Sequence, residues 1–422
     1  MFETIVRYKS ANERAIFENH YDKWDSILVS AHLLSYAKGS LPLLLRDIAQ
    51  ERSLSYYIDP IVSEFRIGSS FRYESGDLRS WHRKYAAELG DPLESILEEG
   101  GNVNARYIEE EDLTAIAESV VDFQENFVYN MLQDQTSKYE DLDVSRREVE
   151  PKAIIPWVHK LETEEDHEAY RTILSSSKAR ASQKLRPVLY TSTQKISRSE
   201  YRMKLVELLS DFDIGECFIL FEDLDKHDTR ESEYRSIIDL VYDISESGID
   251  PYFYYGDFYS NLLHYFGLQG TAFSPLHGEQ FREKEEVPGD GGMQSRYYLD
   301  EVKDFLQIPA AVDIMTRAGK PLCDCEFCSR HFSDWRDIIE QDQDDDRTAV
   351  QTIMMKHRIA TRWQHTQLVQ EESLSEVLNE MREDFEEIAP RYSTSQQVAS
   401  RKELDYIQRW IHAAEERSGL SD

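Results

Sequence analysis

Three cysteines lie close enough in the sequence to bind one metal ion together. Cys323, Cys325 and Cys328 form the run Cys-Asp-Cys-Glu-Phe-Cys, in a chain that has four cysteines in all. Thiolates favour zinc, and one histidine would complete a closed tetrahedral shell that leaves no position open for a substrate. We expect His357 to be that ligand, and His331, which is nearer in sequence, is the alternative. The sequence therefore predicts a structural Zn²⁺ site.

Carboxylates form a second group of residues that could do chemistry, because each follows an apolar run typical of a strand. They are Asp59, Glu222, Asp223 and Asp257. Two carboxylates at one site can cleave a glycosidic bond, one attacking the sugar carbon while the other handles a proton. An acid in this position is also often the cap of the next helix, and this alternative stays open for Asp59, Asp223 and Asp257.

The elements that would position these residues alternate between short apolar runs and helix-patterned segments, which is typical of β/α units. We expect strands at 26–34, 55–59, 152–158, 186–191, 216–221, 251–256 and 270–273. We expect helices at 41–52, 113–133, 198–209, 231–245 and 260–266. The pattern predicts an α/β fold, a TIM-like (β/α)8 barrel whose strand ends carry the functional acids.

Four regions are expected along the chain. Residues 1–77 supply the first barrel strands, and 78–150, with long helical segments, form a helical insertion. Residues 151–312 complete the barrel, and 313–422 form a zinc-binding and C-terminal helical region.

Composition limits the possible functions. The chain of 422 residues has 81 acidic and 48 basic residues, a formal net charge of -33, which argues against a simple basic nucleic-acid-binding protein. The acids are spread along the whole chain, as on the solvated surface of a protein from a halophilic host. Hydrophobic residues at 40% supply a core and exclude global disorder. No run of eighteen apolar residues and no signal peptide is evident, so we expect a cytoplasmic protein without a membrane partner.

One segment contrasts with this acidity. Residues 178–204 contain eight basic residues and a single acid, Glu200. Such a patch could contact a nucleic-acid backbone, with Tyr190 as a surface on which a base stacks, although an ordinary cationic surface is the alternative. Arg358, beside His357, belongs to a weaker second patch. The expected contacts within the main patch are Lys184, Arg186, Lys195 and Arg198.

The order of these elements resembles that of the tRNA-guanine transglycosylases, zinc-bearing barrels that exchange a guanine in RNA for a 7-deazaguanine. The resemblance runs from about Trp24 to Val369 and is most specific at the cysteine motif and the later helix with His357. It implies that Asp59 is a general base. The family's nucleophilic aspartate would directly follow Phe273, where this chain has Ser274.

This departure leaves two interpretations. In the first, Asp59, or else Asp257, attacks the sugar in a rearranged site beside Ser274, and Glu222 or Asp223 reads the base. In the second, the chain is a non-catalytic, nucleic-acid-binding partner subunit of an active transglycosylase.

The resemblance also implies a substrate and partners. The chain ends in helices soon after the cysteine motif, without the RNA-binding domains of archaeal tRNA enzymes. We therefore expect the branch of the family that inserts 7-deazaguanines into DNA, with tRNA as the alternative. The expected partners are DNA, a 7-deazaguanine base, and an oligomer or accessory modification proteins.

Overall fold

The computed structural model describes residues 1–8, 14–17, 21–51, 54–66, 71–135, 144–275, 281, 295–343, 347–392 and 404–420. Seven parallel strands form one curved sheet in the order β3-β2-β1-β7-β6-β5-β4. Their bounds are β1 Glu3–Tyr8, β2 Ser26–Ser30, β3 Ser55–Asp59, β4 Val188–Thr191, β5 Glu216–Phe221, β6 Asp250–Phe253 and β7 Gly270–Phe273.

The segment 152–161 connects the two edges of this sheet. The backbone N–H of Lys152 donates to the carbonyl of Tyr56 in β3 at 2.9 Å, and that of Arg186, just before β4, donates to the carbonyl of Ile154 at 2.8 Å. The strands and this segment thus follow one another around a ring in chain order, so the predicted TIM-like (β/α)8 fold is confirmed. The expected strand at 152–158 makes only isolated bridges, because Pro156 removes a ladder donor.

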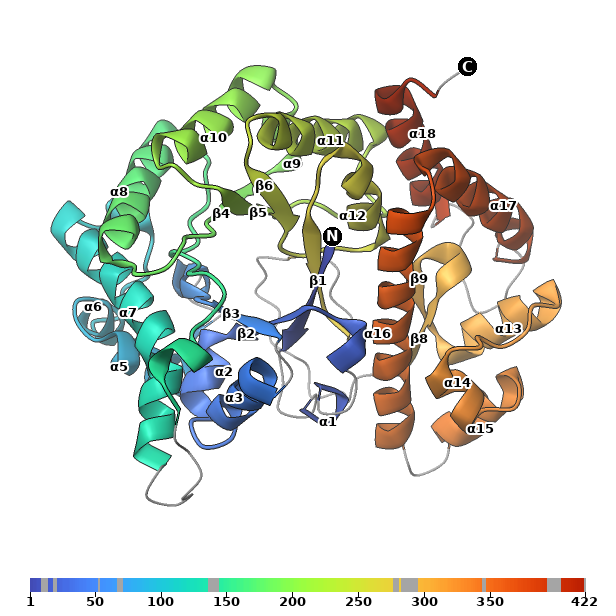
Figure 1. The fold of residues 1–422 in the computed structure, drawn as a ribbon, viewed down its shortest axis with the longest axis horizontal. Helices are drawn as coiled ribbons and strands as arrows, with labels where there is room; N and C mark the ends of the chain where they lie inside the picture. Colours follow the sequence, from blue (N-terminus) through green and yellow to red (C-terminus); the bar gives the residue numbers. More distant parts are fainter. Residues whose placement is uncertain are drawn as a thin grey trace.

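Helices surround the ring (Figure 1). Up to β7 they are α1 Arg14–Phe17, η2 Tyr21–Lys23, α2 Ala31–Tyr36, α3 Leu41–Glu51, η3 Val62–Arg66, α5 Ser80–Leu89, α6 Leu93–Glu98, η4 Ala105–Tyr107, α7 Glu110–Gln135, η5 Arg146–Val149, α8 Glu164–Arg180, α9 Thr193–Ile196, α10 Ser199–Asp211, α11 Glu231–Glu246, α12 Phe258–Leu262 and η6 Leu263–Phe266. Within the described ranges, no helix combines the length and apolar composition needed to cross a membrane.

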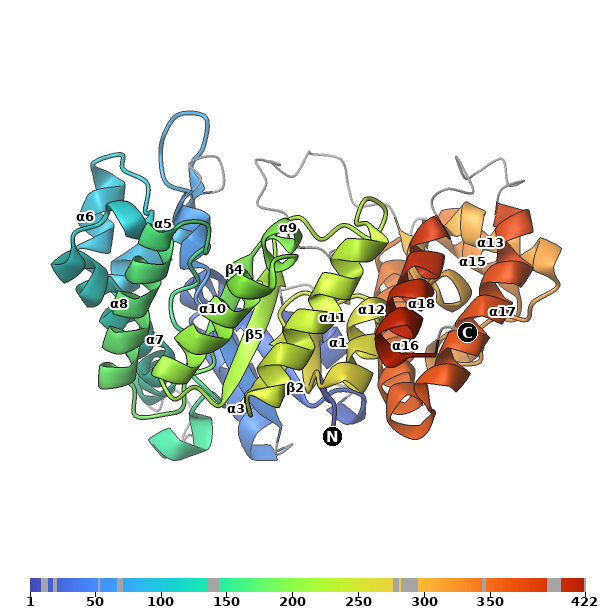
Figure 2. The same ribbon diagram turned by 90° about the horizontal axis from the view of Figure 1, so that it is seen from above.

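A second unit lies beside the barrel (Figure 2). It consists of β8 Arg296–Leu299, η7 Asp300–Val302, β9 Asp304–Gln307, α13 Ile308–Ala318, α14 Glu326–His331, α15 Trp335–Gln343, α16 Arg347–Glu371, α17 Leu374–Tyr392 and α18 Asp405–Ser418. The hairpin of β8 and β9 is separate from the barrel sheet, although we expected the barrel to extend to residue 312. Helix α16 joins the two units, since Thr366 contacts Thr4 of β1 at 2.9 Å between their hydroxyl oxygens.

The barrel interior contains both apolar and charged side chains. Ile5 and Leu28 belong to an inner cluster to which all seven strands and the segment 152–161 contribute. At its amino-terminal end Arg186 binds Glu3 of β1 and Glu216 of β5. Buried charges of opposite sign must be paired in this way because an isolated charge loses its hydration.

The beginning of the barrel differs from the expected strands. These begin at residue 26, but the structure also has β1, whose Glu3 and Arg7 point inward, where ion pairs compensate their charges. The strand expected at 26–34 ends at Ser30, and the helix α2 begins at Ala31.

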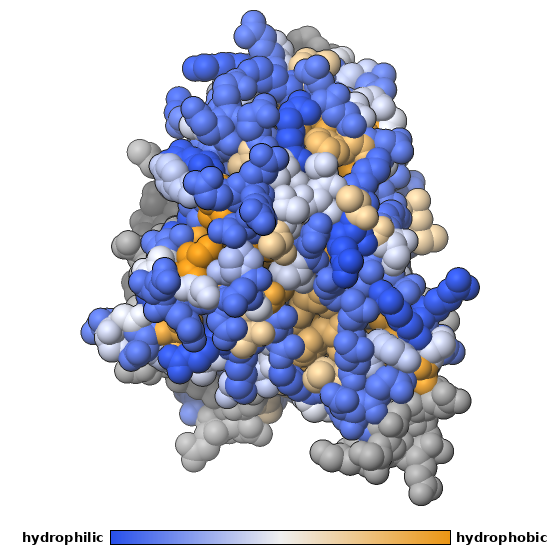
Figure 3. All heavy atoms as spheres, turned by 90° about the vertical axis from the view of Figure 1, so that its left-hand side faces the viewer, coloured by the Kyte–Doolittle hydropathy of each residue, from blue (hydrophilic) through white to orange (hydrophobic). Residues whose placement is uncertain are grey.

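The outer surface over α5 to α8 is mostly hydrophilic, with hydrophobic residues in separate patches (Figure 3).

Arg186→Met should lower the free energy of unfolding by about 3–5 kcal/mol, because the buried Glu3 and the half-buried Glu216 would both lose a cationic partner. Lys184→Met is the matched control, since Lys184 also pairs with Glu216 but is 49% exposed, and it should cost about 1 kcal/mol or less. Urea denaturation measures both. Equal losses would contradict a special role for the buried pair.

Candidate functional site

Asp59 lies at the carboxyl end of β3, at the mouth of the barrel, and is 5% exposed. Its Oδ2 accepts a hydrogen bond from Nη2 of Arg7 at 2.7 Å, and its Oδ1 accepts one from the backbone N–H of Ile61 at 3.0 Å. Nη1 of Arg7 donates to the carbonyl of Tyr254 at 3.0 Å. The ends of β1, β3 and β6 are thus held together by contacts of Arg7 with Asp59 and Tyr254.

Aromatic rings form a wall beside this ion pair, made of Tyr190, Tyr254, Tyr255 and Phe281. The guanidinium carbon of Arg7 lies 3.7 Å from the ring centre of Tyr255. The ring of Phe281 lies 5.3 Å from that of Tyr190 and 5.5 Å from that of Tyr255. Tyr190 and Tyr254 are buried in the inner cluster, whereas Tyr255 and Phe281 are partly exposed. Only the latter two rings could therefore contact a flat, uncharged ligand such as a nucleobase.

Burial changes the protonation equilibria at this mouth. Burial alone would lower the pKa of Arg7, but the oxygens of Tyr255 and Asp59 outweigh it and raise that pKa. Burial, and next the negative charge of Asp59, raise the pKa of Tyr254 well above its ordinary value. Arg7 is therefore charged and Tyr254 neutral at physiological pH.

A lysine occupies another part of the barrel mouth. Nζ of Lys160 lies 2.5 Å from a carboxylate oxygen of Glu222 and 2.5 Å from one of Glu162. Burial opposes the charge of Lys160, but these two carboxylates outweigh it and raise the pKa of the amine. Glu222, one of the expected base-binding residues, is thus paired with a cation and keeps 25% of its side chain exposed.

Two of the candidate acids cap helices. The carboxylate of Asp223 accepts hydrogen bonds from the backbone N–H of Thr193, at 2.7 Å, and from its hydroxyl, at 2.9 Å. Oδ1 of Asp257 accepts one from the backbone N–H of Tyr259 at 3.0 Å, at the start of α12. These contacts give both acids a structural role, and a chemical role for either stays a prediction. Ser274 is fully buried just after β7.

The structure contradicts two of the expected nucleic-acid contacts. Arg186 is fully buried and paired with Glu216 inside the barrel, so it cannot reach a phosphate at the surface. Arg358 is also fully buried, with its guanidinium carbon 3.6 Å from the ring centre of Tyr298. Both predictions were wrong because sequence alone does not distinguish an arginine inside the fold from one on its surface.

The other basic residues of the segment 178–204 lie nearer the surface. Lys184 pairs with Glu216. Lys195 and Arg198 line a cavity of about 540 Å³, where Lys195 donates to the carbonyl of Glu162. Several cations of this segment have carboxylate partners, so the local positive charge is smaller than the sequence indicates.

The four expected metal ligands are together in space. Ligand atoms of Cys323, Cys325, Cys328 and His357 all lie within 4.8 Å of one another. Nδ1 of His357 is 3.4 Å from Sγ of Cys325 and 3.5 Å from Sγ of Cys328. Hydrogen bonds from the other two thiols lower the pKa of Cys325, which favours a thiolate. His331 is exposed and is not in the group found among the described residues. The cluster could therefore bind a metal ion.

Contacts of His357 with residues outside the cluster orient its ring for metal binding. Nε2 of His357 lies 2.9 Å from the carbonyl oxygen of Tyr298, so the proton on Nε2 is donated and Nδ1 is left to face the sulfur atoms. The ring of Tyr297 stacks on that of His357 at 4.5 Å between centres. The hairpin of β8 and β9 therefore fixes the tautomer and the orientation of the ligand.

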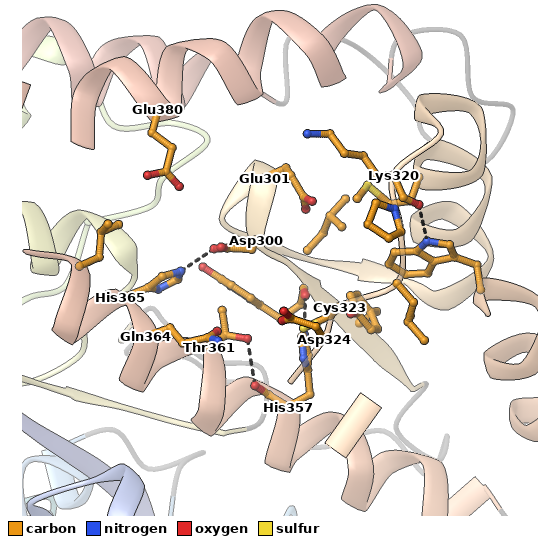
Figure 4. Close-up of a pocket in the computed structure, with 18 residues that line it drawn as sticks. Asp300, Glu301, Lys320, Cys323, Asp324, His357, Thr361, Gln364, His365 and Glu380 are labelled. Atoms are coloured by element: carbon orange, nitrogen blue, oxygen red, sulfur yellow. Dashed lines mark hydrogen bonds and ion pairs between the residues drawn. The ribbon is translucent and has the colours of Figure 1, made fainter. Parts of the chain in front are cut away.

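A cavity of about 540 Å³ adjoins the cluster (Figure 4). His365 binds Asp300 at its edge, at 2.5 Å between Nε2 and Oδ1. Glu301 and Glu380 lie around the same space as Lys320 (Figure 4). Burial raises the pKa of Glu301 to about 7.

Sequence reasoning missed several residues at the mouth, namely Arg7, Lys160, Tyr255 and Phe281. One signal was present for Arg7, because Glu3, Ile5 and Arg7 alternate as one face of a strand. The alternation was not recognised because that face is charged.

No protein-family model and no curated protein matches the chain. A structure from Coccidioides immitis described as a fructose-1,6-biphosphate aldolase is similar at 10% identity and a TM-score of 0.34, over 87% of this chain and 90% of that one. Xylanase B from Clostridium stercorarium F9 is similar at 10% identity and a TM-score of 0.31, over 65% of this chain and 85% of that one.

His357→Ala should remove the bound metal and lower the melting temperature, because metal binding and folding of this unit are coupled. His331→Ala is the control and should keep both, since this histidine lies outside the cluster. Elemental analysis of the purified proteins gives the metal content, and calorimetry gives the melting temperature. Loss of metal in the His331 variant alone would exclude the proposed ligand set.

Proposed function

We propose that the protein is a transglycosylase that exchanges a guanine in nucleic acid, DNA in preference to tRNA, for a 7-deazaguanine. The observation that carries the proposal is the buried Asp59, which pairs with Arg7 at the barrel mouth near the partly exposed rings of Tyr255 and Phe281. Base exchange needs both parts, a carboxylate that attacks the sugar and flat surfaces that hold a base. The sequence resemblance, with its cysteine motif and Asp59, supports the same activity.

The chemistry assigned to these residues has two steps. A carboxylate oxygen of Asp59 forms a bond to C1′ of the nucleotide as the bond from C1′ to the guanine nitrogen breaks. Lys160 donates a proton to the departing guanine, and Glu222 accepts hydrogen bonds from its amino edge. The incoming base then attacks C1′, releases Asp59 and returns a proton to Lys160. Arg7 holds Asp59 in place throughout.

We assign zinc to the cluster of Cys323, Cys325, Cys328 and His357. Three thiolates and one imidazole match the ligands of structural zinc sites, and four protein ligands leave no position for a substrate. The ion would tie α14 to α16, and so hold the second unit against the barrel.

One observation favours a second candidate function, a non-catalytic partner subunit that binds nucleic acid. Both oxygens of Asp59 already accept hydrogen bonds, from Arg7 and from Ile61. Ser274 cannot supply a carboxylate in its place. In this case the aromatic wall would hold a base for an active transglycosylase subunit.

Asp59→Asn should abolish exchange, by at least about 10³-fold, because an amide neither attacks a sugar carbon nor carries the charge that develops there. Asp257→Asn is the matched control, since that side chain accepts a capping bond outside the proposed chemistry. Incorporation of labelled guanine or 7-deazaguanine into DNA and tRNA measures exchange. Activity in Asp59→Asn, or its loss only in Asp257→Asn, would overturn the assignment of Asp59. Absence of exchange in the unaltered protein, with activity in a complex, would favour the partner subunit.

A further inference from the structure

Large aromatic side chains are exposed on one part of the surface of this hydrophilic protein. Tyr36 is 51% exposed, Tyr73 is 53% exposed and Trp81 is 39% exposed. They belong to α2, to the segment before α5 and to α5, and α2 packs against α5. We name these three residues the aromatic rim. Exposed rings on neighbouring elements make this part of the surface a candidate for binding a ligand.

Cations accompany the rings of the rim. Nζ of Lys84 lies 4.3 Å from the ring centre of Tyr36, and the guanidinium carbon of Arg79 lies 5.7 Å from that of Tyr73. Residues 71–85 contain four lysines and arginines against two acids, in a chain whose net charge is -33. The rim is thus locally basic where the protein as a whole repels polyanions.

The segment that carries Tyr73 is held in a defined shape. The backbone N–H of Tyr73 donates to the carbonyl of Asp77 at 2.9 Å, and Arg72 and Leu78 form an antiparallel bridge. The guanidinium of Arg72 also donates to the carbonyl of Leu97 at 2.6 Å. The turn is therefore anchored to the end of α6, so Tyr73 is exposed on a segment of defined shape.

Contacts between rings lead from the aromatic rim toward the end of β3 at Asp59. The ring of Trp81 lies 6.1 Å from that of His32, and the ring of His32 is stacked on that of His82 at 5.5 Å. Ser30, the last residue of β2, pairs with Asp59 of β3, and His32 follows two residues later in α2. Glu64 binds His82 at 2.8 Å and fixes this arrangement. The aromatic rim therefore lies next to the barrel mouth.

We propose that the aromatic rim binds a single-stranded segment of the nucleic acid next to the nucleotide at Asp59. This inference rests on the proposed function. Bases adjacent to an extruded nucleotide are partly unstacked, and exposed rings with neighbouring cations replace the lost stacking and contact the backbone. Double-stranded nucleic acid would not offer its base faces to Tyr36, Tyr73 or Trp81.

The test uses a fluorescein-labelled single-stranded oligodeoxynucleotide and fluorescence anisotropy with the full chain, without any incoming base. Tyr73→Ala and Trp81→Ala should each weaken binding about tenfold, as expected for the loss of one stacking platform. Tyr242→Ala is the matched control. Tyr242 is also an exposed tyrosine, 38% exposed, with Arg417 at 4.4 Å from its ring centre, but it lies on α11.

The outcomes separate this inference from the proposed function. Weaker binding in both rim variants with unchanged binding in Tyr242→Ala supports the rim, even where no base exchange is detected. Unchanged binding in Tyr73→Ala overturns it, even where the unaltered protein exchanges bases, since this residue lies on the surface and its loss leaves the fold intact. Equal weakening in all three variants also overturns it. Equal affinity for a duplex of the same sequence excludes a single-stranded ligand.

Discussion

The arrangement of the barrel mouth depends on the buried ion pair of Arg7 and Asp59. Removing either partner would leave a charge without hydration or a counter-charge, which costs several kcal/mol in a protein interior. The pair therefore fixes the end of β3 relative to β1, and the bond from Arg7 to the carbonyl of Tyr254 extends the constraint to β6. The rings of Tyr254 and Tyr255 lie against the same guanidinium. Stability and the proposed chemistry thus draw on one contact.

The amino-terminal end of the same strand carries a second set of paired charges. Glu3 of β1 lies in contact with Lys152 and Arg186, and Arg186 continues to Glu216 of β5. Ion pairs inside the barrel therefore connect β1 at both of its ends. At the carboxyl end Arg7 joins β1 to β3, and at the amino end Glu3 joins β1 to the segment 152–161 and, through Arg186, to β5. This explains how an irregular segment can complete the ring, since side-chain contacts take over from the missing ladder bonds.

The sequence was sufficient for the fold class and for the cluster of cysteines and His357 that could bind a metal ion, and insufficient for the charged residues inside the barrel. Regular alternation of strand and helix patterns predicts β/α units, and the strands at 55–59, 216–221 and 270–273 have the expected bounds. Cysteine spacing is a local property, so it could be recognised without the fold. Whether Arg186 or Arg358 faces solvent depends on contacts with residues far away in the sequence. Arg7 and Lys160 were missed for the same reason. Their roles depend on contacts with Asp59 and Glu222, which lie far away from them in the sequence.

The charge of the protein and its aromatic surfaces suit one mode of nucleic-acid binding. A net charge of -33 opposes long-range attraction of a polyanion, and several cations of the segment 178–204 are paired with carboxylates. High salt would weaken the remaining electrostatic attraction further, since the screening length falls to about 3 Å at 1 M. Stacking of bases on aromatic rings is far less sensitive to salt. A protein with this charge would therefore depend on aromatic surfaces for affinity, and on exposed cations such as Lys84 for alignment of the backbone.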